Sequence, residues 1–233
     1  MARFSNSESV ERFSLFRQNH TIDSKGKEVA IILFSGEFTV NQKTFNRESV
    51  FDGEICGFFL ANQETHEIVV DNYAEFCVIE AASDAKVSFS AIQPSQIIAR
   101  QAGTGNFGRT VKTIIDNSIG FKKLIIGETI KDAGNWSSWP PHKHDTHTVN
   151  TQSEQKEIYL YKFSKPNGFG IQLIYENGIL DAKSSIVMNN SEIKIERGYH
   201  PVVSAPHSEM YYLWSLFGDN SFFKVYTDLD YGD

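Results

Sequence analysis

Short apolar runs rich in aromatic and β-branched residues follow one another along the chain, separated by Gly, Asn, Asp and Ser at intervals of roughly 8 to 12 residues. The pattern predicts strands over residues 29–34, 67–71, 76–81, 122–128, 158–163, 170–175, 185–188 and 210–216. Asn167-Gly168 and Asn177-Gly178 beside these runs predict tight antiparallel hairpins. One short helix is predicted over Ser7–Arg17. The fold class is therefore all-β.

Two of the predicted strands have similar sequences. Lys27–Ser35 and Lys156–Ser164 share Lys, Glu, Phe and Ser at matching positions, which makes Glu28 the counterpart of Glu157. Each copy lies in a half the size of a small domain, so we expect two similar β-barrels in tandem. The Gly-rich stretch from Gly103 to Arg109 is the expected joint, giving domains 1–108 and 109–233.

Composition narrows the function classes. The net charge is −7, from 22 Lys and Arg against 29 Asp and Glu, and no cluster of basic residues offers a surface for nucleic acid or anionic lipid. No apolar run approaches the roughly 18 residues of a membrane span. Cys56 and Cys77 are expected to be reduced core thiols. We therefore expect a cytoplasmic protein with no nucleic-acid and no membrane partner.

The stretch Gly103–Gly108 has the spacing of a dinucleotide-binding motif. That motif must follow a strand and open a helix, whereas the residues after Gly108 continue as β-like sequence. The motif is therefore rejected, and a flexible connection is expected in its place.

Histidines are concentrated in the second half of the chain. The first half contains His20 and His66. The second half contains five histidines: His142, His144, His147, His200 and His207. His142 and His144 lie at i and i+2, so on a strand both imidazoles leave the same face. Such a pair is also compatible with a polar loop.

Two further residues favour a metal site over a polar loop. Glu157 opens a strong predicted strand, and His200 precedes another apolar stretch. Three imidazoles and one carboxylate suit a divalent ion such as Zn, Mn or Fe and leave positions open for a substrate.

Longer motifs around these residues carry a family resemblance. The motifs are Ala133–Ser138, Pro140–Asp145, Glu157–Tyr159, Gly168–Gly170, Arg197–Val202 and Tyr211–Leu213. Together they resemble the 5-deoxy-glucuronate isomerase family, bicupin enzymes of inositol catabolism, and the related uronate ketol-isomerases of pectin breakdown. The likeness is dense from Gly103 to Asp230 and thin over the first hundred residues.

The resemblance implies a bicupin of two tandem jelly-roll barrels, with one divalent metal in the second. It makes His142, His144, Glu157 and His200 the metal ligands. The implied reaction is the aldose–ketose isomerisation of 5-deoxy-D-glucuronate, a small uronic acid, to 5-dehydro-2-deoxy-D-gluconate. No His-x-His precedes Glu28, so the first barrel is expected to be free of metal and structural. Cupins often associate with copies of themselves, so a homo-oligomer is expected.

Several other residues are candidates for the reaction. Tyr159 and Tyr161 share the strand face of Glu157. Two interpretations are open: they contact substrate or donate a proton to it, or they pack in the core. Arg109 matches a recurring Arg after the Gly-rich stretch, and it binds a substrate carboxylate or lies on the surface. Tyr212 lines a sugar pocket or belongs to the core.

Two other function classes use the same residues. The first alternative is a dioxygenase, in which the His3Glu site holds iron. The second is a metal-dependent module that binds a sugar acid without catalysing a reaction. The absence of a DNA-binding segment weakens a regulatory version of the second.

Overall fold

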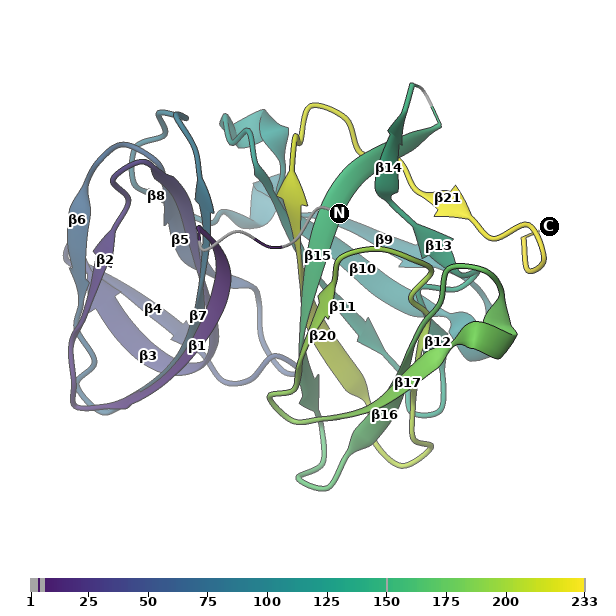
Figure 1. Ribbon diagram of the computed structural model, residues 1–233. Helices are drawn as coiled ribbons and strands as arrows, with labels where there is room; N and C mark the ends of the chain where they lie inside the picture. The colour runs from purple at the N-terminus through teal and green to yellow at the C-terminus, as the bar shows by residue number, and fades with distance from the viewer. Residues whose placement is uncertain (1–3, 5–6, 150, 233) are drawn as a thin grey trace. The chain divides into compact units, whose positions relative to one another are not determined.

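The computed structural model describes residue 4, residues 7–149 and residues 151–232. All its extended elements are β-strands, and its only helical segments are short 3-10 turns at Pro94–Gln96, Gly105–Phe107, Asn117–Ile119 and Ile179–Asp181. The all-β prediction is confirmed (Figure 1). Among the described residues, no helix has the length and apolar composition needed to span a membrane.

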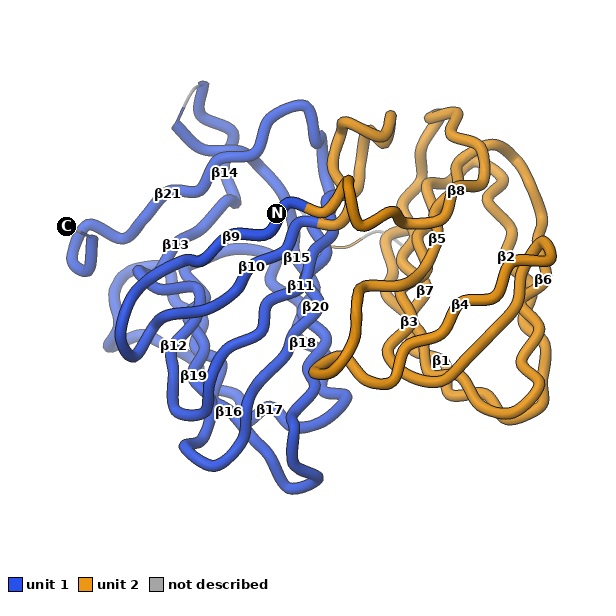
Figure 2. Tube along the Cα trace, turned by 180° about the vertical axis from the view of Figure 1, so that it is seen from behind, with its two compact units in different colours: residues 1–3, 98–113, 125–233 blue, residues 4–97, 114–124 orange. Residues whose placement is uncertain are grey.

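The chain divides into two compact units (Figure 2). The N-terminal unit, in orange, comprises Phe4–Ile97 and Ile114–Leu124, and the C-terminal unit, in blue, comprises Ile98–Thr113 and Ile125–Asp233. The expected boundary at residue 108 differs from this division, because residues 98–108 lie with the C-terminal unit and residues 114–124 with the N-terminal unit.

The Gly-rich stretch is a hairpin turn and not a linker. Strands β9 (Ile98–Ala102) and β10 (Arg109–Ile115) pair antiparallel from Arg109 opposite Ala102 onward. Gly103 has a φ of 72°, and a Cβ atom there would lie 2.4 Å from the carbonyl oxygen of Phe107. The tight turn therefore requires glycine at this position.

The N-terminal unit is built on one sheet of six strands. Its order is β1-β7-β3-β5-β8, and β4 pairs with β3 at one side. The strands are β1 (Glu8–Phe16), β3 (Lys27–Val40), β4 (Lys43–Arg47), β5 (Cys56–Leu60), β7 (Tyr73–Ala82) and β8 (Ser90–Ala91). A separate pair consists of β2 (His20–Asp23) and β6 (Thr65–Ile68). The core includes Val29, Ile31 and Leu33 from β3.

The predicted helix over Ser7–Arg17 is wrong, because these residues form strand β1. It pairs with β7 along its full length, from Glu8 opposite Ala81 to Phe16 opposite Tyr73. Phe13 and Leu15, two residues apart, pack on the core of the unit. Pairing with β7 supplies the backbone hydrogen bonds that a short isolated helix would have to make alone.

The C-terminal unit contains two larger sheets. The seven-stranded sheet has the order β14-β15-β20-β11-β10-β9, with β18 also paired to β15, and the four-stranded sheet has the order β12-β19-β16-β17. The remaining pair is β13 with β21. Besides β9 and β10, the strands are β11 (Leu124–Lys131), β12 (Trp136–Ser137), β13 (His142–Lys143), β14 (Asp145–Thr148), β15 (Gln152–Phe163), β16 (Phe169–Ile174), β17 (Lys183–Met188), β18 (Glu192–Ile195), β19 (Val202–Ser204), β20 (Met210–Gly218) and β21 (Tyr226–Thr227).

The core of this unit lies between its two sheets. Tyr161 of β15 and Tyr212 of β20 pack with Val187 of β17 and Val202 of β19 in one buried cluster. The inward side chains of the long sheet are thus aromatic and carry hydroxyl groups, which brings polar atoms into the centre of the unit.

Two turn predictions have different outcomes. Strands β16 and β17 form the expected antiparallel pair, but the connection that contains Asn177-Gly178 is longer than the predicted tight turn, because it also contains the 3-10 turn Ile179–Asp181. Asn167-Gly168 does not close a hairpin, because β15 and β16 belong to different sheets. The polar stretch from Thr146 to Lys156 belongs largely to the paired strands β14 and β15.

Candidate metal centre

Three separate segments of the C-terminal unit supply the predicted ligands. Strand β13 contains His142, and His144 follows after one residue, so the two imidazoles leave the same side of an extended chain. Glu157 lies within β15. His200 lies two residues before β19. These residues are therefore brought together only by the packing of the unit.

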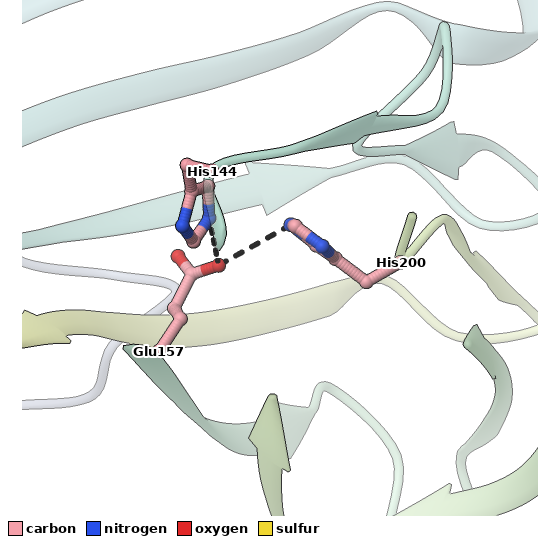
Figure 3. A group of neighbouring side chains, drawn as sticks. All are labelled: His144, Glu157 and His200. Atoms are coloured by element: carbon pink, nitrogen blue, oxygen red, sulfur yellow. Dashed lines mark hydrogen bonds and ion pairs between the residues drawn. The ribbon is translucent and has the colours of Figure 1, made fainter. Parts of the chain in front are cut away.

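The side chains of His144, Glu157 and His200 converge in the interior (Figure 3). His144 Nε2 lies 3.2 Å and His200 Nε2 3.3 Å from Oε2 of Glu157. All three residues are buried, and one ligand atom from each lies within 4.8 Å of the others. The ring of His142 adjoins this group, with its centroid 5.0 Å from that of His200. This buried group can hold a metal ion.

Each of the three imidazoles is oriented by the backbone. Their Nδ1 atoms each contact a carbonyl oxygen: His142 to Pro140 at 3.2 Å, His144 to Gln155 at 3.0 Å and His200 to Gly198 at 2.9 Å. A carbonyl only accepts hydrogen bonds, so Nδ1 carries the proton. In the neutral ring, Nε2 then has a free lone pair, and this is how metal-binding histidines are held in proteins.

The Nε2 atom of His200 shows that the group suits a cation. It is fully buried and makes no hydrogen bond to the residues that the structure describes, although it lies close to Glu157. A buried polar atom without a partner is costly, and a metal ion would supply that partner. Imidazole nitrogens together with one carboxylate are a donor set suited to Zn, Mn or Fe in the divalent state.

Electrostatics set the charges of this buried group. Burial raises the pKa of Glu157, but the contacts with His144 and His200 outweigh it and lower this pKa to about 2. Burial also lowers the pKa of His144, and the Glu157 carboxylate more than reverses that effect. For His142, burial and then the charges of His200 and His144 lower the pKa to about 3. At neutral pH Glu157 is therefore ionised and His142 is neutral.

The predicted tyrosines lie on the core side of the same unit. Tyr159 is the nearest to the group, with its ring 6.0 Å from that of His200 and its hydroxyl 3.1 Å from Ser138 Oγ. The Tyr212 hydroxyl is hydrogen-bonded to Ser137. Burial raises the pKa of Tyr159 well above its ordinary value, so its phenol keeps the proton at neutral pH.

Comparison with known proteins identifies the family. The model of the KduI/IolB family matches residues 13–233 of the chain. The chain belongs to the KduI/IolB family. The resemblance to 5-deoxy-glucuronate isomerases that was predicted from the motifs is thereby confirmed.

The curated relatives described next are named 5-deoxy-glucuronate isomerase. The 5-deoxy-glucuronate isomerase of Geobacillus kaustophilus is 27% identical over 216 residues, which cover 90% of the chain and 78% of that protein. The 5-deoxy-glucuronate isomerase of Bacillus subtilis is 28% identical over 218 residues, covering 90% and 80% respectively.

Solved structures agree at the level of the fold. An IolB-like protein from Salmonella typhimurium has a TM-score of 0.88 at 24% identity, covering 96% of the chain and 88% of that protein. Oxalate decarboxylase from Lactobacillus farciminis has a TM-score of 0.60 at 8% identity, covering 95% and 80%. The second likeness is consistent with the predicted bicupin fold.

Arg109 of the KduI/IolB chain does not join the group. It opens β10, is half-buried and donates from Nη1 to the carbonyl oxygen of Phe107 at 3.0 Å. In the part of the chain that the structure describes, no contact links its guanidinium to Glu157 or to the histidines.

Gln172 supports the site but was not predicted. Its Nε2 donates to the carbonyl oxygens of His200 at 2.7 Å and Pro201 at 3.1 Å, and its Oε1 accepts a hydrogen bond from the Tyr161 hydroxyl. Gln172 is only 1% exposed, whereas its apolar neighbour Ile171 is 39% exposed. The inward position is polar because it holds the backbone of His200.

Proposed function

We propose that this chain is a metal-dependent isomerase that converts 5-deoxy-D-glucuronate to 5-dehydro-2-deoxy-D-gluconate, in the cytoplasm and in myo-inositol catabolism. The proposal is carried by one observation: a buried group of His144, Glu157 and His200 lies inside a member of the KduI/IolB family. The relatives named 5-deoxy-glucuronate isomerase supply the substrate class, a small uronic acid.

We assign one divalent ion, Zn, Mn or Fe, to His142, His144, Glu157 and His200. The place of the His142 ring beside His200 and its hydrogen bond to Pro140 support its role as the fourth ligand. When bound, such an ion supplies Lewis-acid stabilisation of negative charge on substrate oxygens. The chain holds the three imidazoles in the tautomer that presents Nε2.

The tyrosines have different proposed roles. The Tyr159 phenol lies closest to the ligands and keeps its proton, so it serves as a hydrogen-bond donor to the reacting oxygen atoms. Tyr161 is fully buried and donates to Gln172, so it acts through the backbone of His200. In both proposed roles the tyrosine hydroxyl has a hydrogen-bond partner, Ser138 for Tyr159 and Gln172 for Tyr161.

Recognition of the sugar acid is assigned to Tyr212 and Arg109. Tyr212 packs 4.7 Å from Tyr159, ring centroid to ring centroid, on the same inward side of the sheet. Arg109 has the same inward phase along β10 as the core residue Val111. Among the described contacts its Nη1 alone is hydrogen-bonded, so its guanidinium has further N–H groups to offer a carboxylate.

The test is an isomerase assay on 5-deoxy-D-glucuronate under nitrogen, with protein reconstituted with Zn or Mn alone. We expect full turnover, and in D2O we expect solvent deuterium at the former aldehyde carbon, because an enediol route exchanges the transferred proton with water. A strict requirement for O2 or for iron would indicate a dioxygenase. Tight uronate binding without product would indicate a binding module.

A further inference from the structure

The strand that carries His142 belongs to neither of the larger sheets. In the described part of the chain its ladder partner is β21, with His142 opposite Thr227 and Lys143 opposite Tyr226. Figure 1 shows β21, in yellow, alongside β13. The residues from 219 to 232, called the strap below, therefore provide the backbone pairing of a ligand-bearing strand.

The first part of the strap is fixed to β15. Gln155 Nε2 donates to the carbonyl oxygens of Asp219 at 2.8 Å and Phe222 at 3.1 Å. The backbone of the same Gln155 bonds His144 twice, since its N–H donates to the His144 carbonyl at 2.8 Å and its carbonyl accepts from Nδ1. This end of the strap and His144 thus share one buried anchor.

The second part of the strap is fixed by Asp228, which has contacts on two sides. Its backbone N–H donates to the carbonyl oxygen of Pro141 at 2.8 Å, next to His142. Its Oδ2 accepts a hydrogen bond of 2.7 Å from the hydroxyl of Tyr175, which is buried. Asp228 therefore joins the His142 segment to Tyr175.

Tyr175 continues this connection to the third ligand. Its backbone exchanges two hydrogen bonds with Tyr199, at 3.0 and 2.8 Å, and Tyr199 directly precedes His200. The chain of contacts Pro141, Asp228, Tyr175 and Tyr199 thus runs from one ligand segment to another. A second tie, from the Asp145 carboxylate to Gly198 N–H at 2.8 Å, links the His144 side.

We propose that Asp228, held by the Tyr175 hydroxyl, is a positioning residue that fixes the strand of His142 against the segment of His200. The inference rests on the proposed function for the identity of the ligands. Asp228 touches no ligand side chain among the described contacts, so it acts by setting the spacing of the two backbone segments. Removing groups that are hydrogen-bonded to metal ligands typically changes metal affinity by about 10- to 100-fold, and we expect a change of this order when the backbone spacing of two ligands is released.

The test uses Tyr175→Phe and Asp228→Ala in the full-length protein, with Tyr231→Phe as a matched control on the strap. Tyr231 packs its ring on Trp139 at 5.4 Å, and among the described contacts its hydroxyl takes no part in the connection. Its backbone N–H donates to the carbonyl oxygen of Asp228, and Tyr231→Phe leaves that bond in place. We expect the first two variants to bind Co(II) or Zn about 10- to 100-fold more weakly by chelator competition. Their Co(II) absorption spectrum should differ from that of the wild type, whereas the control should match it.

A second measurement separates this inference from the proposed function. Amide hydrogen exchange over residues 141–144 in metal-free protein should accelerate in Tyr175→Phe and Asp228→Ala but not in Tyr231→Phe. Wild-type affinity, spectrum and exchange in both variants would overturn the positioning role. Failure of the wild type to bind any metal would overturn the proposed function, and the exchange experiment would still decide the role of Asp228.

Discussion

Glu28 and Glu157 occupy matching places in two similar sequence segments, but their side chains lie on opposite faces of their strands relative to the core. In β15 the core residues Tyr159 and Tyr161 share the face of Glu157. In β3 the core residues Val29 and Ile31 are out of phase with Glu28. A shift of one residue moves every side chain of a strand to the other face, so the two glutamates are not structural counterparts.

The buried carboxylate of Glu28 has a structural task instead. It accepts hydrogen bonds from the Ser83 hydroxyl and from the backbone N–H groups of three successive residues, Lys122 at 2.6 Å, Lys123 at 3.0 Å and Leu124 at 3.0 Å. Both carboxylate oxygens therefore already have donors, and the residue anchors the 122–124 segment within the N-terminal unit.

The first prediction concerns this anchor. Glu28→Gln should lower the free energy of unfolding by about 1–3 kcal/mol, because its amide group faces N–H donors and leaves at least one of them unpaired. Denaturant unfolding measures this loss. Metal content and turnover should stay within a few fold of the wild type, and a loss of turnover with the fold intact would contradict the structural role.

The second prediction concerns the metal ligands. His142→Ala, His144→Ala, His200→Ala and Glu157→Gln should each lose metal and activity together, because an incomplete set of donors loses affinity. Elemental analysis of the purified variants measures the metal content.

Two exposed histidines provide the controls for this experiment. His147→Ala and His207→Ala should keep full metal content, since both side chains face solvent. Full stoichiometry in a His142→Ala, His200→Ala double variant would refute the ligand assignment.

The third prediction concerns Gln172. Gln172→Leu keeps the approximate size of the side chain but removes the donors to His200 and Pro201 and the acceptor for Tyr161. We expect metal affinity to fall by about 10- to 100-fold. The matched control is Gln101→Leu, which breaks an exposed hydrogen bond to Thr110 and should leave metal affinity unchanged. Equal affinities in the two variants would argue against support of His200 by Gln172.

The fourth prediction concerns Lys131, a buried lysine that donates to the carbonyl oxygens of Asn135 and Val202. Burial, and then the charge of Arg109, lower its pKa to about 6. In the unfolded chain the Lys131 side chain has a pKa of about 10.4. Between about pH 6 and 10 this side chain therefore binds a proton in the unfolded chain but not in the folded protein. Stability therefore rises with pH across this window, by at most about 1.4 kcal/mol per pH unit.

Lys131→Met should remove this dependence. Denaturant unfolding of metal-free protein at several pH values between about 7 and 9.5 should show the wild type gaining stability relative to the variant as pH rises, a window set by about one pH unit of margin inside the two pKa values. The exposed Lys123→Met provides the control and should follow the wild type. Parallel curves for wild type and Lys131→Met would contradict the lowered pKa.

The sequence by itself determined the fold class and the family. Runs of β-branched and aromatic residues between turn residues are a local signal, and they located the long strands because period-2 alternation depends only on neighbouring residues. The motifs around His142, Glu157 and His200 identified the family because each motif is a run of consecutive residues and can be recognised without the fold. At Ser7–Arg17 the local signal predicted a helix, and pairing with β7 makes the segment a strand instead.

Tertiary structure alone decided which face of each strand is buried and what holds the ligands. Glu28 and Glu157 look alike in sequence, and only the register of their sheets puts Glu157 on the face of the core residues Tyr159 and Tyr161 and Glu28 on the face opposite Val29 and Ile31. Gln172 is buried beside the exposed Ile171. Strand β13 is two residues long, and its partner β21 lies more than 80 residues away. Such choices depend on pairing between distant segments, and a local pattern carries no information about a partner that the chain reaches only after folding.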